Sequence, residues 1–165
     1  MPHILLATDA DWIVAEVTAA LGGPDTSFTV VREGRKVHEV VRAKGEPDLA
    51  ILDLQVGSMG GMAITMDLHH DESVGAYGHV PVLMLLDRVA DNHLAKRAGA
   101  EGWIIKPLDA FRLQRATAAI LGGGTYTEGL ERQVVDAPVE SVAAPLAEEV
   151  PDPEPTAEEE PTAAG

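Results

Sequence analysis

The chain has 165 residues, a formal net charge of −15 and no cysteine. Disulfides and thiolate metal sites are therefore excluded, and no apolar stretch approaches the roughly 18 residues of a membrane-spanning helix. Residues 133–165 contain acidic residues but no basic ones. This acidity argues against direct binding to nucleic acid, which requires clustered positive charge. Because the chain begins Met1-Pro2-His3 without a signal-peptide pattern, we expect a cytoplasmic protein with no membrane association.

The composition changes after the glycines at 122–124. Beyond them proline, glutamate and alanine dominate, and six of the eleven prolines follow Val135. Such a segment cannot bury enough apolar surface to offset the entropy cost of ordering it. We therefore predict one folded domain over residues 1–124 and a disordered acidic tail over residues 125–165.

Within the predicted domain, short apolar runs alternate with segments of helical periodicity. The run from Ile4 to Ala7 suits a strand buried on both faces, and Ile13, Val14 and Val17 repeat at the spacing of a buried helix face. In chain order, the sequence predicts a strand over 4–7, a helix over 11–21, a strand over 28–31, a helix over 34–44, a strand over 49–52, a helix over 62–70, a strand over 80–86, a helix over 90–98, a strand over 103–105 and a helix over 110–121.

Five apolar strands alternating with five helices predict an α/β fold, a doubly wound five-stranded parallel sheet with helices on both faces. The strand order 2-1-3-4-5 is expected, and ligands bind such sheets at the carboxyl ends of the strands. Asp9, Asp53 and Lys106 follow the first, third and fifth predicted strands. Asp9 and Asp53 should then lie close together and repel one another unless a cation lies between them. Mg²⁺ prefers such oxygen ligands, and the lysine would offset the charge of a phosphoryl group on a carboxylate.

Further motifs lie at the ends of the third and fifth predicted strands. Asp53 lies in the segment LAILDLQVGSMGG, which ends at Gly61, and Lys106-Pro107 follows the segment GAEGWII. In these features residues 3–121 resemble the response-regulator receiver domain of two-component signalling. The resemblance implies a flavodoxin-like fold and a cis peptide bond before Pro107.

The resemblance also implies roles for individual residues. Asp53 would accept the phosphoryl group, and Lys106 would neutralise its charge. Mg²⁺ would be bound by Asp9, Asp53 and the backbone carbonyl of Gln55. Trp103 would be the aromatic residue of the switch that follows phosphorylation.

Two parts of the site depart from the family pattern. The family has two adjacent acids after the first strand, and Thr8 replaces one of them; Asp11 could partly compensate or could only cap the first helix. After the fourth strand, Leu86 stands where the family has threonine or serine, and Asp87 where it has a small residue. Leucine cannot donate a hydrogen bond to a phosphoryl oxygen, a loss of about 1.5–3 kcal/mol, and Asp87 adds a like charge. The coupling between the side chain at position 86 and Trp103 should therefore differ from the one in the family.

These residues support two interpretations, neither of them an enzyme. In the first, the chain is a stand-alone receiver, a monomer or weak homodimer, that takes a phosphoryl group from a histidine kinase onto Asp53 and acts through contact with an output protein. In the second, it is a pseudo-receiver that binds its partner without phosphorylation. Thr8, Leu86 and Asp87 favour the second interpretation, and the two acids and the lysine at the strand ends favour the first.

Other chemistries have less support in the sequence. An aspartate-nucleophile phosphatase needs a general acid two residues after the nucleophile, where this chain has Gln55. Flavin binding lacks a Ser/Thr-rich phosphate loop after the first strand. His69 and His70 are adjacent on a predicted helix and do not face one another, which predicts a solvated surface rather than a metal site.

Overall fold

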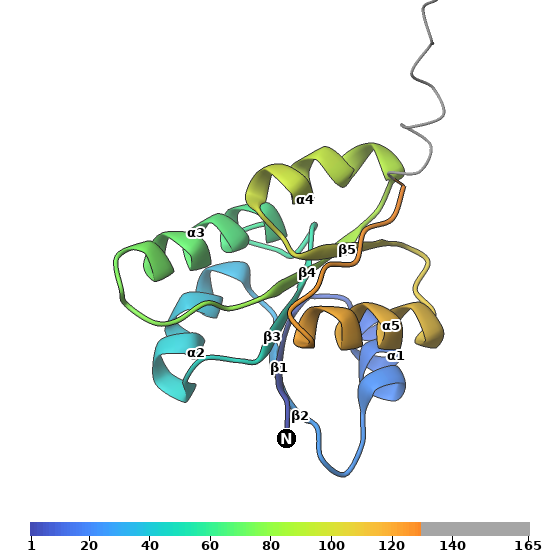
Figure 1. Ribbon diagram of the computed structural model, residues 1–165, viewed down its shortest axis with the longest axis horizontal. Coiled ribbons are helices and arrows are strands. Elements are labelled where there is room, and N and C mark those ends of the chain that lie inside the picture. The colour runs from blue at the N-terminus through green and yellow to red at the C-terminus, as the bar shows by residue number, and fades with distance from the viewer. Residues whose placement is uncertain (130–165) are drawn as a thin grey trace, which may run out of the picture.

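The computed structural model, which describes residues 1–129, confirms the predicted alternation of strands and helices (Figure 1). In chain order the elements are β1 (His3–Ala7), α1 (Asp11–Leu21), β2 (Ser27–Val31), α2 (Val37–Lys44), β3 (Leu49–Asp53), α3 (Gly61–Ser73), β4 (Val82–Leu86), α4 (Asn92–Ala98), β5 (Gly102–Ile105) and α5 (Ala110–Leu121). Short 3-10 turns, Gly34–Lys36 and Val89–Asp91, lead into α2 and α4. Across residues 1–129, no helix combines the length and apolar character needed to cross a membrane.

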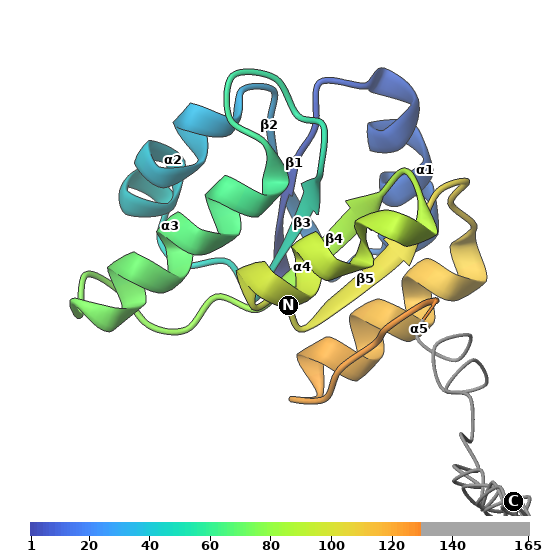
Figure 2. The same cartoon turned by 90° about the horizontal axis from the view of Figure 1, so that it is seen from above.

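The five strands form one parallel sheet in the order β2-β1-β3-β4-β5, which confirms the predicted topology. The pairing of β1 with β3 brings Ala7 opposite Leu52, so the carboxyl ends of these two strands lie side by side. Helices α1 and α5 cover one face of the sheet, and α2, α3 and α4 cover the other (Figures 1 and 2). The residues that follow β1 and β3 therefore meet at one edge of the sheet.

The central strands form the core. Every residue of β3 and β4 is buried, as expected for apolar runs in strands that are covered on both faces. Leu6, Leu85 and Leu113 belong to the cluster beneath α1 and α5. On the other face, Leu52 and Ile64 belong to the cluster beneath α2 and α3. This packing gives the strand ends a rigid base.

Several element boundaries differ from the sequence prediction by one to three residues. Strand β4 begins at Val82 rather than Val80, because Pro81 has no N–H to donate to a neighbouring strand. Helix α3 extends past its predicted end at His70 to Ser73. The longer helix brings its last turn close to the loop that leads into β4.

Residues 125–129 extend the packed structure beyond the expected boundary at residue 124. They run beside β5, the edge strand, where the backbone N–H of Trp103 donates to the carbonyl of Tyr126 at 2.8 Å (Figure 1). An uncovered edge strand exposes unpaired backbone groups, so this segment, the C-terminal strap, shields β5. The expected start of the tail at residue 125 is corrected accordingly, and the expected disorder of residues 130–165 lies outside the described residues.

Candidate functional site

Asp53 lies at the carboxyl end of β3 and is almost fully buried, with an exposed fraction of 3%. Thr8 Oγ1 donates a hydrogen bond to Asp53 Oδ2 at 3.0 Å. Lys106 Nζ and the backbone N–H of Gln55 donate to Asp53 Oδ1 at 2.7 Å and 3.1 Å. A buried charge is tolerated only when it is paired and hydrogen-bonded. These three donors therefore fix the orientation of the carboxylate at the strand end.

Lys106 follows β5, and its ammonium group bridges two carboxylates. Its Nζ donates to Asp53 Oδ1 at 2.7 Å and to Asp87 Oδ1 at 2.9 Å. Burial alone would lower the pKa of Lys106, but the hydrogen bonds to Asp53 and Asp87 outweigh it and raise the pKa above its ordinary value. The side chain is therefore a cation throughout the neutral pH range. The peptide bond between Lys106 and Pro107 is cis, as the resemblance implied.

Asp9 follows β1 and approaches the loop after β3. The backbone N–H of Gly57 donates to Asp9 Oδ2 at 3.2 Å, and a Cβ at position 57 would lie only 3.1 Å from that oxygen. Asp9 is exposed whereas Asp53 is buried, so the site opens to solvent on the side of Asp9. The two carboxylates and the backbone carbonyl of Gln55 are hard oxygen donors of the kind that Mg²⁺ prefers. The donor set therefore fits the expected ion.

Thr8 takes the place of the acid that is missing from the family pattern. It is fully buried, donates to Asp53, and accepts a hydrogen bond from the backbone N–H of Ala10 at 3.2 Å. Asp11 does not compensate for the missing acid. Its side chain is 92% exposed and forms an ion pair with Arg32 at 2.6 Å. The site consequently has one carboxylate fewer than the family pattern.

The substitution Thr8→Asp is expected to tighten Mg²⁺ binding about tenfold, because it adds a carboxylate to the ligand set. Without Mg²⁺, the same substitution buries a second negative charge beside Asp53, so the thermal midpoint should fall. Calorimetric titration and thermal melts with and without Mg²⁺ measure both effects. Thr8→Asn is the uncharged control of matched shape. Equal Mg²⁺ affinities for the two variants would contradict the position assigned to the ion.

The end of β4 carries an apolar side chain where the family has a hydroxyl. Leu86 has an exposed fraction of 0% and belongs to one apolar cluster with Met84 and Trp103 beneath α4. A coupling between Trp103 and a hydroxyl at position 86 is therefore absent. The exposed Asp87 instead binds Lys106 and competes with Asp53 for its charge.

Glu128 was assigned to the tail from the sequence, yet it ties the C-terminal strap to β5 and α5. Its backbone carbonyl accepts a hydrogen bond from Trp103 Nε1 at 2.8 Å. Its carboxylate accepts from the backbone N–H of Ile105 and from Arg112 Nη1, both at 2.8 Å. These partners precede Glu128 by 25, 23 and 16 residues. Because these partners are distant in the sequence, no local pattern identifies Glu128 as a structural residue. The strap also fixes the indole of Trp103 through the hydrogen bond from Nε1.

Comparison with known proteins agrees with this geometry. Residues 4–118 match the family model described as the response regulator receiver domain. Protein PilH of Pseudomonas aeruginosa is 26% identical over 125 residues, a match that covers 74% of this chain and 100% of PilH. Transcriptional regulatory protein DegU of Brevibacillus brevis is 30% identical over 107 residues, which covers 62% of this chain. The match spans only 43% of DegU.

Solved structures show the same fold. Chemotaxis response regulator CheY4 of Vibrio cholerae has a TM-score of 0.63 at 22% identity, with 73% of this chain and 98% of that chain covered. A LuxR-family two-component response regulator from Aurantimonas sp. SI85-9A1 has a TM-score of 0.66 at 23% identity, with coverages of 81% and 99%. These structural likenesses establish the fold, and the family match over residues 4–118 establishes the kinship. The chain belongs to the response regulator receiver domain family.

Proposed function

We propose that the chain accepts a phosphoryl group on Asp53 and transmits the signal through protein–protein contact. The observation that carries the proposal is the 2.7 Å contact between the buried carboxylate of Asp53 and the ammonium group of Lys106. A buried ion pair is weak evidence for stability, because apolar packing of similar volume often stabilises a fold as well. Its position at the strand ends, where this kind of sheet binds ligands, supports a functional role.

An oxygen of Asp53 would attack the phosphorus atom of a phosphohistidine on a histidine kinase. A P–O bond forms as the P–N bond breaks, and the electron pair of the P–N bond stays with the imidazole, which takes up a proton. The product is an acyl phosphate on Asp53. Lys106, which already donates to Asp53 Oδ1, would lie beside the phosphoryl oxygens and offset their charge.

Mg²⁺ would be held by Asp9, Asp53 and the backbone carbonyl of Gln55. When bound, the ion supplies positive charge that reduces repulsion between these carboxylates and a phosphoryl group. The hydrogen bond from Thr8 keeps the Asp53 carboxylate oriented. Because Thr8 supplies no carboxylate to the ion, we expect Mg²⁺ binding to be weak.

The charge of the chain supports output through protein contact. A net charge of −15 opposes approach to the phosphate backbone of DNA. We therefore propose a signalling module rather than an enzyme, acting as a monomer or weak homodimer on a protein partner.

Incubation of the full chain with acetyl phosphate and Mg²⁺ tests the proposal. Mass spectrometry should detect one added phosphoryl group, and peptide mapping should place it on Asp53. Asp53→Asn should abolish the adduct, because the amide that replaces the carboxylate is a poor nucleophile. Asp71→Asn, at a buried acid on α3, is the matched control and should remain phosphorylated. An adduct that persists in Asp53→Asn would exclude Asp53 as the acceptor.

A second candidate function, a pseudo-receiver that works without phosphorylation, is favoured by two observations at β4. Leu86 is fully buried and offers no hydroxyl, and Asp87 already binds Lys106. A pseudo-receiver would take up no phosphoryl group and would keep its partner affinity in Asp53→Asn. Efficient phosphorylation of the wild-type chain would exclude this function.

A further inference from the structure

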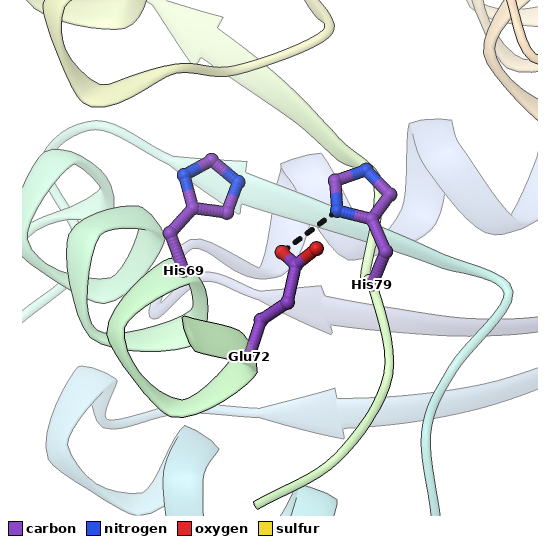
Figure 3. Close-up of side chains that lie close together, drawn as sticks. All are labelled: His69, Glu72 and His79. Carbon is purple, nitrogen blue, oxygen red and sulfur yellow. Dashed lines mark hydrogen bonds and ion pairs between the residues drawn. The ribbon is translucent and has the colours of Figure 1, made fainter. Parts of the chain in front are cut away.

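A second cluster of polar side chains lies at the opposite end of the sheet from Asp53. Helix α3 returns from the carboxyl end of β3 toward the amino end of β4, and its last turns carry His69 and Glu72. His79 lies in the loop that leads into β4, facing both residues (Figure 3). One ligand atom from each residue lies within 4.8 Å of the other two. We propose that this His69–Glu72–His79 cluster binds a Zn²⁺ ion.

His79 is oriented to present one ring nitrogen to the cluster. Its Nε2 lies 2.8 Å from Glu101 Oε1, and the second oxygen of Glu101 accepts a hydrogen bond from the backbone N–H of Val82 at 2.6 Å. Nδ1 of His79 lies 2.9 Å from Glu72 Oε2, a contact that needs a proton on Nδ1. A bound ion would displace this proton, and neutral His79 would still donate Nε2–H to Glu101. A carboxylate that fixes the tautomer of a metal-binding histidine is a recurring feature of zinc sites.

His69 offers the second nitrogen. Its Nε2 is buried and has no hydrogen-bond partner among residues 1–129. A buried polar atom without a partner costs free energy that a ligand would recover. The Nδ1–Cε1 edge of the ring packs against Gly99, where a Cβ would lie 3.0 Å from Cε1 and 3.1 Å from Nδ1 of His69. This contact leaves the Nε2 edge facing Glu72 and His79 (Figure 3).

The chemistry of the three ligands points to Zn²⁺. Two imidazoles and one carboxylate, with a fourth position left for water, form a recurring ligand set for this ion. Mg²⁺ prefers oxygen ligands in octahedral geometry and would not compete. Metal–ligand bonds of about 2.0–2.2 Å place ligand atoms about 3.3–3.6 Å apart in a tetrahedral site. The ion would therefore draw the most distant pair together by about 1 Å, a shift within reach of side-chain rotation.

The sequence predicted a solvated surface for both adjacent histidines of α3. That expectation fits His70, which is exposed, but not His69, which is half-buried. The difference arises because His79 and Gly99 come from later loops that fold against the end of α3. His70 is therefore a matched control for the binding experiment, as the same residue type at the neighbouring position.

Calorimetric titration of the full chain with Zn²⁺, in excess Mg²⁺, tests the proposal. The wild type should bind one Zn²⁺, and either His69→Ala or His79→Ala should weaken binding by about 100-fold or more. Glu101→Gln, which removes the negative charge from the side chain that contacts His79 and Val82, should weaken binding about tenfold. His70→Ala and Asp53→Asn should bind as the wild type does. Co²⁺ used as a spectroscopic probe should give visible absorption that is lost in His69→Ala.

Two results would overturn the proposal. The first is Zn²⁺ affinity in His69→Ala and His79→Ala equal to that of the wild type. The second is equal weakening by His70→Ala, which would indicate loose binding to surface histidines. Circular dichroism of each variant checks that the fold is intact. Since Asp53→Asn removes the phosphoacceptor, Zn²⁺ binding in that variant separates this site from the proposed function.

Discussion

Replacing Leu86 with threonine and Asp87 with alanine is expected to tighten binding of beryllofluoride, a phosphoryl mimic, about tenfold in the presence of Mg²⁺. A hydroxyl at position 86 supplies the missing donor, and a donor to a charged group can contribute the ~1.4 kcal/mol that this factor requires. The second change frees Lys106, whose Nζ now lies 2.9 Å from Asp87 Oδ1. The rate or extent of Asp53 phosphorylation should rise with mimic affinity.

The control for this experiment separates the hydroxyl from the change of shape. Leu86→Val combined with Asp87→Ala has nearly the shape of the threonine variant but lacks the donor. Both double variants should lose stability, by about 1–3 kcal/mol, because Leu86 is packed in the core. Equal mimic affinity in the two variants would show that the hydroxyl contributes nothing. Failure of the wild type and of both variants to bind the mimic would refute phosphoryl acceptance on Asp53.

A chain that ends at Gly124 is expected to have a thermal midpoint about 10 °C below that of the full chain. The truncation removes the strap, so β5 becomes an open edge and Arg112 loses its ion pair with the carboxylate of Glu128. The hydrogen bonds to the Trp103 indole and to the backbone N–H of Ile105 disappear as well. Together these losses amount to about 2–4 kcal/mol, and each kcal/mol lowers the midpoint of a domain of this size by about 3–5 °C.

A chain that ends at residue 135 is the control for this truncation. It keeps the strap and removes the proline-rich acidic segment, so its midpoint should equal that of the full chain. Glu128→Gln keeps the backbone contact to Trp103 and removes the charge that faces Arg112, so it should give an intermediate midpoint. Identical midpoints for chains ending at 124 and at 135 would show that the strap does not stabilise the domain.

Local sequence patterns by themselves determined the elements of the fold and part of the site. Apolar runs such as Leu49 to Leu52, bounded by polar residues, are too short for core helices and suit strands covered on both faces. Because parallel strands all end at the same edge of a sheet, Asp53 and Lys106 could be placed together from their positions after two strands. Their 2.7 Å contact confirms that placement.

Only the tertiary structure decided which groups contact Asp53 and how residues 125–129 pack beside β5. The Thr8 hydroxyl could have faced any neighbour, and its bond to Asp53 depends on the register between β1 and β3. Glu128 and His79 lie in irregular segments, where no periodicity indicates which way a side chain points. The periodicity of apolar residues indicates which face of a helix or strand is buried. Contacts between loops depend instead on the packing of whole elements, so they emerge only once the chain is folded.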